Sequence, residues 1–269
     1  MLSEIFKLFW KTVERKDKRR INSQTSPTEI EQFCDIQYID DGLWQHRLDV
    51  YSKSGKLSHR PVIIDIHGGG WMYGTKEINK NYCLVLAQKD YVVVNINYRL
   101  APDFSVADQL RDCFFAFKWV STNIEKYGGD LNNVFVTGDS AGGFLAAYSA
   151  LLNSSEKLRK IFGVTESGLE FRACGLTSPV CFMNTHTFQD VYYSRVKGKE
   201  FSESTLRGFE NFDAVLNKGS MPPTFLVTSS GDAVGRLPTI KMYNLLCGEG
   251  VKCKLENLSL IHISEPTRH

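Results

Sequence analysis

The chain has 269 residues, of which 42% are hydrophobic and 23% charged, and its formal net charge is +2. This length and composition are typical of a globular protein with a large, well-buried core. The small net charge gives no argument for nucleic-acid binding, and no apolar run approaches the length of a membrane span. We therefore expect one large domain that neither binds nucleic acid nor crosses a membrane.

The seven cysteines are scattered along the chain without the spacing of metal ligands. Most lie in apolar segments, which favours free, buried thiols in a reducing compartment. Residues 1–10 lack a long apolar stretch and a small-residue cleavage site, so no secretory signal is expected. A cytoplasmic location follows from these features, and no metal or organic cofactor is implied.

Residues 1–22 form the first predicted element, an amphipathic helix whose apolar residues recur at helical spacing between lysines and arginines. The favoured interpretation is a cap helix that packs its apolar stripe on the domain. The alternative is weak contact of residues 1–20 with an anionic membrane surface. Serines and a proline at 22–28 indicate a linker, so residues 1–30 are assigned to an N-terminal cap helix and linker.

Strands and helices alternate along the rest of the chain. The expected strands cover residues 34–39, 48–51, 61–66, 91–96, 134–137, 169–180, 225–228 and 251–255. The expected helices cover residues 76–89, 106–127, 140–152 and 237–247. Several strands are continuous apolar runs, as buried parallel strands require. The alternation predicts an α/β fold with a mostly parallel central sheet and helices on both faces.

A serine between glycines stands where the expected strand 134–137 meets the helix that follows it. The motif is Gly138-Asp139-Ser140-Ala141-Gly142. In such a strand–turn–helix setting, a G-x-S-x-G turn holds the serine on a strained corner with its hydroxyl exposed above the sheet. The helix start adds positive potential where an oxyanion would form. An incidental serine in a glycine-rich turn is the alternative, which this setting disfavours, so Ser140 is the predicted nucleophile.

A second glycine-rich motif, HGGGW at residues 67–71, directly follows the expected strand 61–66. Backbone N–H groups of such a loop, with that of the residue after the nucleophile, form an oxyanion hole in α/β-hydrolases. The predicted donors are Gly69, Gly70 and Ala141. His67 and Gly68 are expected to support this loop, with His67 acting through hydrogen bonds rather than as the general base.

Three blocks now stand in one order along the chain: HGGGW at 67–71, YRLAP at 98–102 and GDSAGG at 138–143. In these blocks the chain resembles the hormone-sensitive-lipase-like family of α/β-hydrolases, which includes carboxylesterases and arylacetamide deacetylases. The resemblance covers about residues 36–255. It implies the α/β-hydrolase fold over residues 31–257, with a helical cap that draws on the N-terminal helix and on an insertion around 182–219. Asp103 replaces the glutamate that usually follows the second block.

The resemblance also implies an acid just after a late buried strand, and then a histidine. Asp232 follows the expected strand 225–228 and is the predicted acid, which would orient the imidazole of the base. The family usually has Pro-Leu after this aspartate, whereas this chain has Ala233 and Val234. A solvated loop aspartate is the alternative interpretation.

The predicted general base lies in an unusual segment. His262 stands thirty residues after Asp232, about where the family places its histidine. However, residues 258–268 resemble the translation of a sequencing-library adaptor, so residues 258–269 are interpreted as a non-native tail. Native sequence is expected to end near Asn257, with the native histidine segment missing.

Two interpretations of His262 therefore remain. It is either an accidental stand-in at a suitable position or a tail residue with no defined place, and we favour the second because a triad needs close support from its surroundings. The other histidines, His46, His59 and His186, are weaker candidates because two of them precede the core sheet and one lies in the cap-like region.

The resemblance implies a serine carboxylester hydrolase that acts on small or medium esters through an acyl-enzyme. An arylamide or formamide hydrolase is one alternative, and a ligand-binding pseudo-hydrolase that has lost its histidine is another. Without its base, this chain is expected to show little activity, with a small residual rate from the oxyanion hole. Aromatic residues of the 182–219 region line an apolar pocket or form the core of the cap, and the sequence leaves both interpretations open.

Overall fold

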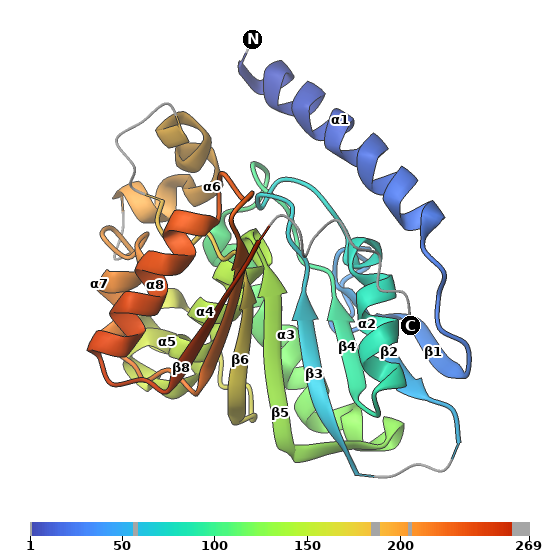
Figure 1. The fold of residues 1–269 in the computed structure, drawn as a ribbon. Coiled ribbons are helices and arrows are strands. Elements are labelled where there is room, and N and C mark those ends of the chain that lie inside the picture. Colours follow the sequence, from blue (N-terminus) through green and yellow to red (C-terminus); the bar gives the residue numbers. More distant parts are fainter. Residues whose placement is uncertain (1, 56–58, 184–188, 204–205, 260–269) are drawn as a thin grey trace.

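The computed structural model describes residues 2–55, 59–183, 189–203 and 206–259 (Figure 1). Two histidines singled out in the sequence, His186 and the predicted base His262, lie outside these described residues. Most of the predicted tail, from residue 260 onward, lies outside them as well.

One eight-stranded sheet organises the chain, in the order β1-β2-β4-β3-β5-β6-β7-β8. The strands are β1 (Ile30–Gln37), β2 (Arg47–Lys53), β3 (Arg60–Ile66), β4 (Val92–Ile96), β5 (Gly129–Asp139), β6 (Phe171–Thr177), β7 (Thr224–Ser229) and β8 (Cys253–Leu258). Strands β1 and β2 pair antiparallel, whereas all pairs from β4 to β8 are parallel. The predicted mostly parallel sheet is confirmed, and the carboxyl ends of its central strands share one edge.

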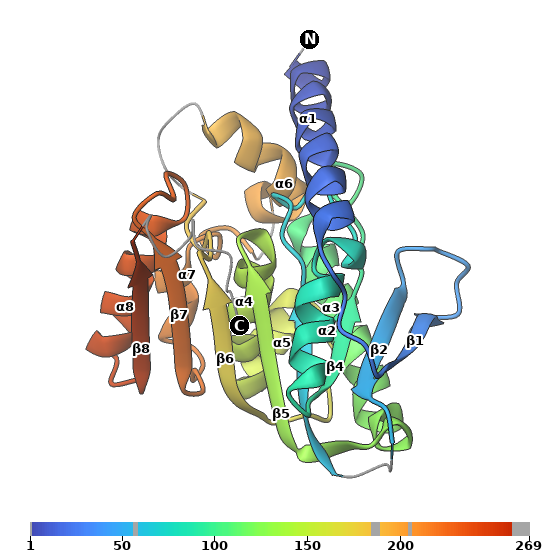
Figure 2. The ribbon, with the colours of Figure 1, turned by 45° about the vertical axis from the view of Figure 1, so that its right-hand side comes forward.

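Helices cover both faces of this sheet, as predicted (Figures 1 and 2). The helices are α1 (Leu2–Ser23), α2 (Lys80–Gln88), α3 (Val106–Asn123), α4 (Ala141–Ser154), α5 (Glu156–Phe162), α6 (Gln189–Glu203), α7 (Phe212–Leu216) and α8 (Arg236–Gly248), with short 3-10 turns η1 (Lys76–Ile78) and η2 (Ile124–Tyr127). Helices α3 and α4 pack on one face of the sheet, where α8 also covers β7 and β8, whereas α2 packs on the opposite face. The helix expected over 76–89 is therefore divided into η1 and α2.

Alternate side chains of the strands build the core. Along β3, Val62, Ile64 and Ile66 are fully buried in the main cluster. The same cluster holds four aromatic residues of α3 and α4, namely Phe114, Phe117, Phe144 and Tyr148. On the other face, Tyr51 of β2 and Val93 of β4 pack against α2. Burial of apolar surface on both sides explains why these strands are continuous apolar runs.

The thiols divide into a buried and an accessible group. Four are buried, namely Cys83, Cys113, Cys174 and Cys181. The Sγ atoms of Cys247 at the end of α8 and Cys253 at the start of β8 lie 3.1 Å apart, near the molecular surface. The buried group bears out the expectation that most thiols lie in apolar segments.

Helix α1 lies beside the segment that follows β3. The ring of Trp10 stacks on that of Tyr73 at a centroid distance of 5.3 Å, and Arg20 donates to the backbone carbonyl of Ile78. Leu8 and Phe9 are exposed, at 68% and 55% of their surface, so only part of the apolar stripe is covered. None of the helices in the described part of the chain is both long and apolar enough to cross a membrane.

Helices α6 and α7 lie between β6 and β7 in the chain; α6 lies above the carboxyl edge of the sheet, whereas α7 packs on α4 (Figure 1). Glu200 of α6 forms an ion pair with Arg111 of α3, which fixes this helix to the domain. Phe182, Tyr193 and Phe212 are buried in the main core. For these three aromatic residues, the structure decides in favour of a core position.

Candidate active site

Ser140 stands on a strained corner between β5 and α4. Its backbone angles are φ 51° and ψ −114°, a region that residues with a side chain rarely adopt. Three backbone hydrogen bonds hold the corner: Ser140 donates to the carbonyl of Thr177, and its own carbonyl accepts from Phe144 and Val180. The half-buried serine therefore has the local geometry that the G-x-S-x-G motif predicts.

The two glycines around Ser140 are required by close packing of main chain on main chain. A Cβ atom on Gly142 would overlap the carbonyl oxygens of Ile66 and His67 at the end of β3, and one on Gly138 would overlap the carbonyl of Gly142. The start of α4 thus rests directly on the end of β3, where the HGGGW loop begins.

This contact predicts that Gly142→Ala lowers the free energy of unfolding by about 3 kcal/mol or more, because backbone must move to admit the methyl group. Gly248→Ala is the matched control. A Cβ there meets no atom within 4 Å, and alanine raises helix propensity by about 1 kcal/mol. Urea unfolding of both variants measures the difference, and equal stabilities would contradict the packing argument.

The HGGGW loop turns sharply after β3. Gly69 and Gly70 have φ angles of 120° and 57°, and the carbonyl of Gly69 accepts the N–H groups of Met72 and Tyr73. Within the described residues, the N–H groups of Gly69, Gly70 and Ala141 donate to no acceptor. Ala141 is the first residue of α4, where N–H groups have no partner inside the helix. These are the three predicted oxyanion donors, and all are free to bind a ligand oxygen.

The YRLAP block supports the same loop from below. The Tyr98 hydroxyl donates to the carbonyl of His67 at 2.8 Å. The Tyr98 ring also stacks on the His67 imidazole, at a centroid distance of 4.4 Å. His67 Nδ1 donates to the carbonyl of Gly68, and the Ala101 N–H donates to the carbonyl of Trp71. Burial lowers the pKa of His67 to about 4, so this side chain is neutral at pH 7 and positions the loop.

Two carboxyl groups lie beside the loop. Asp139 Oδ1 accepts the Gly68 N–H at 3.0 Å, and the Asn79 side chain donates to both Asp139 and Asp65. Burial, together with the charge of Asp139, raises the pKa of Asp65 to about 7, against opposing hydrogen bonds from Asn79 and Cys83. Burial also raises the pKa of Asp139. The pair therefore retains protons at a pH where exposed carboxyl groups have lost them.

Asp65 makes stability depend on pH. Because its pKa is higher in the folded than in the unfolded chain, stability present below about pH 4 is lost as pH rises toward 7. Asp65→Asn keeps an acceptor for Asn79 and removes this loss. We expect the variant to exceed the parent in free energy of unfolding by a few kcal/mol at pH 8, and by less at pH 5. Urea unfolding at the two pH values tests this; a difference independent of pH would contradict it.

The predicted acid, Asp232, lies beyond the carboxyl end of β7, two strands from Ser140. Its Oδ1 accepts the N–H groups of Val234 and Gly235 at 3.0 and 2.8 Å. Burial opposes its charge, but the Ser178 hydroxyl and these two N–H groups bring the pKa of Asp232 below its usual value. A carboxylate held ionised at this edge suits the role of orienting an imidazolium.

His67 belongs to the loop support, and His46 lies just before β2, at the carboxyl edge of the sheet but three strands away from β5. His46 is buried between Asp41 and Asp112, to which its ring nitrogens bond at 2.7 and 3.2 Å. His59 is exposed just before β3, at the amino edge. The structure thus brings Ser140, the loop glycines and Asp232 to one edge, while His262 stays a prediction by position.

Two aromatic residues stand over the loop: Tyr192, one of the aromatic residues for which a pocket position was left open, and Trp10, for which no contact with the site is predicted. The Tyr192 hydroxyl of α6 donates to the carbonyl of Gly70, and the Trp10 ring of α1 lies against the same glycine. The N-terminal helix and the cap-like segment therefore meet at Gly70 of the HGGGW loop.

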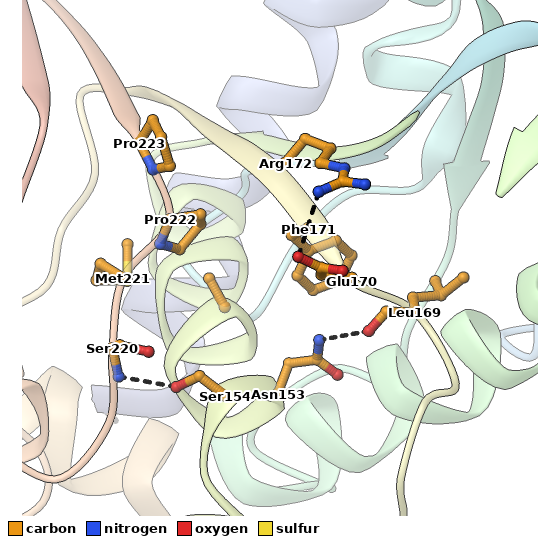
Figure 3. A pocket seen from close by; sticks show the side chains of 11 residues that line it. Asn153, Ser154, Leu169, Glu170, Phe171, Arg172, Ser220, Met221, Pro222 and Pro223 are labelled. Carbon is orange, nitrogen blue, oxygen red and sulfur yellow. Dashed lines mark hydrogen bonds and ion pairs between the residues drawn. The ribbon is translucent and has the colours of Figure 1, made fainter. Parts of the chain in front are cut away.

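A cavity of about 430 Å³ lies at the opposite end of α4 and has a different character (Figure 3). Its polar groups bond to one another: Ser220 N–H donates to Ser154, and Asn153 donates to the carbonyl of Leu169. Helix α4, with 14 residues, separates this cavity from Ser140 by about 20 Å. The cavity has no part in the candidate active site.

Metal chemistry has no ready ligand set in the described part of the chain. There, no group of three or more histidine, cysteine, aspartate or glutamate side chains is placed to hold an ion. The candidate site consists of a serine, free N–H donors and a carboxylate, a set of groups that suits covalent acyl transfer.

The sequence profile of the BD-FAE family matches residues 48–192, more than half of the chain. The chain belongs to this family. The match runs from β2 into α6 and so includes the HGGGW loop, the corner at Ser140 and the segment that leads into α6. This BD-FAE member is a hormone-sensitive-lipase-like α/β-hydrolase, as its three sequence blocks predict.

Several curated relatives of this BD-FAE protein are named as esterases. Isoprenylcysteine alpha-carbonyl methylesterase from Arabidopsis thaliana is 28% identical over 198 residues, covering 70% of this chain and 46% of the relative. Carboxylesterase NlhH from Mycobacterium tuberculosis is 34% identical over 113 residues, covering 42% and 35%. The chain spans less than half the length of these relatives.

Solved structures show the same fold over nearly the whole chain. Esterase B from Lactobacillus rhamnosis, in a complex with a phosphonate inhibitor, matches with a TM-score of 0.90 at 28% identity. The match covers 97% of this chain and 84% of esterase B. It confirms the predicted α/β-hydrolase fold.

Proposed function

We propose that this BD-FAE protein is a serine carboxylester hydrolase that acts through an acyl-enzyme. The observation that carries the proposal is the corner at Ser140, with three unpaired N–H groups on Gly69, Gly70 and Ala141 beside it. A positive-φ serine next to free N–H donors suits attack on a carbonyl whose oxygen becomes negative. The esterase names of the relatives support an ester as the substrate.

In the proposed reaction, Ser140 Oγ attacks the acyl carbonyl while a base takes its proton. The oxyanion is held by the three N–H groups until the alkoxide leaves with that proton, and water then releases the acid. Asp232 would orient the base and stabilise its cation. His262 is the candidate base by position alone.

The substrate is proposed to be a small or medium ester. Trp10 and Tyr192 stand against Gly70, so large aromatic surfaces border the place where the carbonyl oxygen would bind. Apolar acyl or alcohol groups would pack on these rings. Cleavage of arylamides by the same residues, and ligand binding without catalysis, remain the competing proposals.

The remaining assignments are also proposals. Residues 1–30 form a cap helix and linker, residues 31–257 the hydrolase domain with a cap insertion around 182–219, and residues 258–269 a non-native tail. A cytoplasmic location agrees with the buried thiols. The exposed Leu8 and Phe9, beside the basic residues of α1, would support weak contact with an anionic membrane surface.

Ser140 is expected to become acylated by an activated ester. On incubation with p-nitrophenyl acetate, the peptide that contains Ser140 should gain about 42 Da, the mass of an acetyl group, as an acyl-enzyme accumulates. Ser140→Ala should show no such gain, and peptide mapping by mass spectrometry separates this site from acetylated lysines. Absence of acetyl on Ser140, with equal release of p-nitrophenol by both proteins, would exclude the proposed nucleophile.

His262→Ala is expected to leave the steady-state rate of ester hydrolysis unchanged. The reason is that residues 258–268 resemble adaptor sequence, so we do not expect this segment to give the close support that a catalytic base needs. Both proteins should show only the small residual rate that an oxyanion hole sustains without a base. A fall of about 1,000-fold in the variant would instead identify His262 as the base.

A further inference from the structure

Asn79 occupies a position where its side chain would ordinarily serve its own helix. It is the N-cap residue of α2, and asparagine is among the residues that best cap a helix. Here its side chain makes no capping hydrogen bond. Both Nδ2 hydrogens are used elsewhere, since Nδ2 lies 2.9 Å from Asp65 Oδ2 and 2.8 Å from Asp139 Oδ1.

The bond to Asp139 leads directly to the oxyanion loop. The same Oδ1 atom of Asp139 accepts the Gly68 N–H at 3.0 Å. A Cβ on Gly68 would overlap the Asp139 carboxylate, so loop and carboxylate are in close contact. A chain of hydrogen bonds thus runs from Asn79 at the start of α2, through Asp139, to Gly68 in the loop. Asp139 directly precedes Ser140 in the sequence.

The backbone that carries Asn79 is itself fixed by the sheet. Lys76 donates its N–H to Asn97 at 2.6 Å, and its carbonyl accepts from Asn95 of β4 at 2.7 Å. The buried Lys76 ammonium bonds to Asp49 of β2 at 2.9 Å. Because these partners belong to two strands, or directly follow one, the Asn79 amide is anchored rather than carried along by the loop.

We propose that Asn79 is a positioning residue of the esterase site, which holds the Asp139 carboxylate so that the oxyanion loop keeps its place beside Ser140. The proposal rests on the proposed function. Asn79 touches neither the substrate nor the reacting atoms in this role. It fixes the orientation of one carboxylate, and that carboxylate fixes the Gly68 N–H one residue before the predicted donors.

The placement of this amide matters because oxyanion donors act through their geometry. Donors must lie about 3 Å from the developing oxyanion, and loss of one donor lowers the rate about 100- to 1,000-fold. A displacement of about 1 Å has a comparable effect. Asn79 and Asp139 connect the loop with the turn at Ser140. In this role they keep Gly69 and Gly70, on the loop, at a fixed position relative to Ala141, on α4.

The variant that tests the proposal is Asn79→Leu. A cavity of about 220 Å³ adjoins the two carboxyl groups, so alanine would leave room for water to replace the amide. Leucine keeps the volume and removes the donor. Asn81→Leu is the matched control, because it makes the same substitution two residues further on, at a half-buried position of the same helix.

The first readout is acetylation of Ser140 as a function of p-nitrophenyl acetate concentration. Asn79→Leu should lower the limiting rate about 10- to 100-fold and leave the half-saturating concentration near that of the parent. Asn81→Leu should match the parent in both. Since an oxyanion hole retains its effect without a base, the comparison holds whichever interpretation of His262 is right.

The second readout is hydrogen exchange of the Gly68 amide, which needs no catalysis. Asn79→Leu should speed exchange there, while amides in the middle of β3 exchange as in the parent. Asp139→Asn, which keeps the side-chain shape, provides the same two readouts should the leucine variant fail to fold.

Unchanged acetylation and unchanged Gly68 exchange in Asn79→Leu would overturn the positioning role. An equal fall in both leucine variants would overturn it too, because the effect would then belong to α2 as a whole. Absence of Ser140 acetylation in the parent would count against the proposed function instead, and the exchange measurement would still decide whether Asn79 holds the loop.

Discussion

The site depends on the contact between the first turn of α4 and the carboxyl end of β3. Only glycine at 142 lets the helix rest on the carbonyl groups of Ile66 and His67. This one approach brings the corner at Ser140 beside the loop that leaves β3, although the two motifs lie 70 residues apart. Parallel pairing of β3 with β5, which sets Ile66 opposite Gly138, establishes the same alignment from within the sheet.

Around this contact, the rest of the chain acts as support. Tyr98 stacks beneath the loop, the Lys76 network fixes its far end, and Tyr192 and Trp10 cover it from outside. The supports come from the segment after β4 and from η1, α6 and α1, so elements from the first and second halves of the chain converge on five residues. Such convergence explains how a loop rich in glycine, which is intrinsically free, is held in one conformation.

The fold was largely predictable because its strands are apolar runs and its motifs have a fixed structural setting. The predicted strand 134–137 is confirmed, but the observed strand β5 begins earlier, at Gly129. Its first residues are mostly polar and pair with β3 only at the margin of the sheet, so they lack the apolar pattern of a buried strand. Helix α5 is not predicted from the sequence, although Ser155 and Gly163 cap it, because seven residues show too little periodicity.

The contacts of the candidate site were harder to predict than the fold. The hydrogen bond from Asn79 to Asp139 joins residues 60 apart, and no local sequence pattern indicates such a pair. Asp139 was visible in its motif but had no role until its partners were known.

The proton held by the buried carboxyl pair has an electrostatic consequence. Asp65 and Asp139 lie beside the loop that would receive a negative oxygen, and two full charges there would oppose its formation. Burial raises the pKa of both groups, that of Asp65 to about 7, so the pair carries less than its full charge near neutrality. The groups that fix the loop in space therefore oppose an anion less than two fully ionised carboxylates would, because part of the charge beside the Gly68 N–H is neutralised by protons.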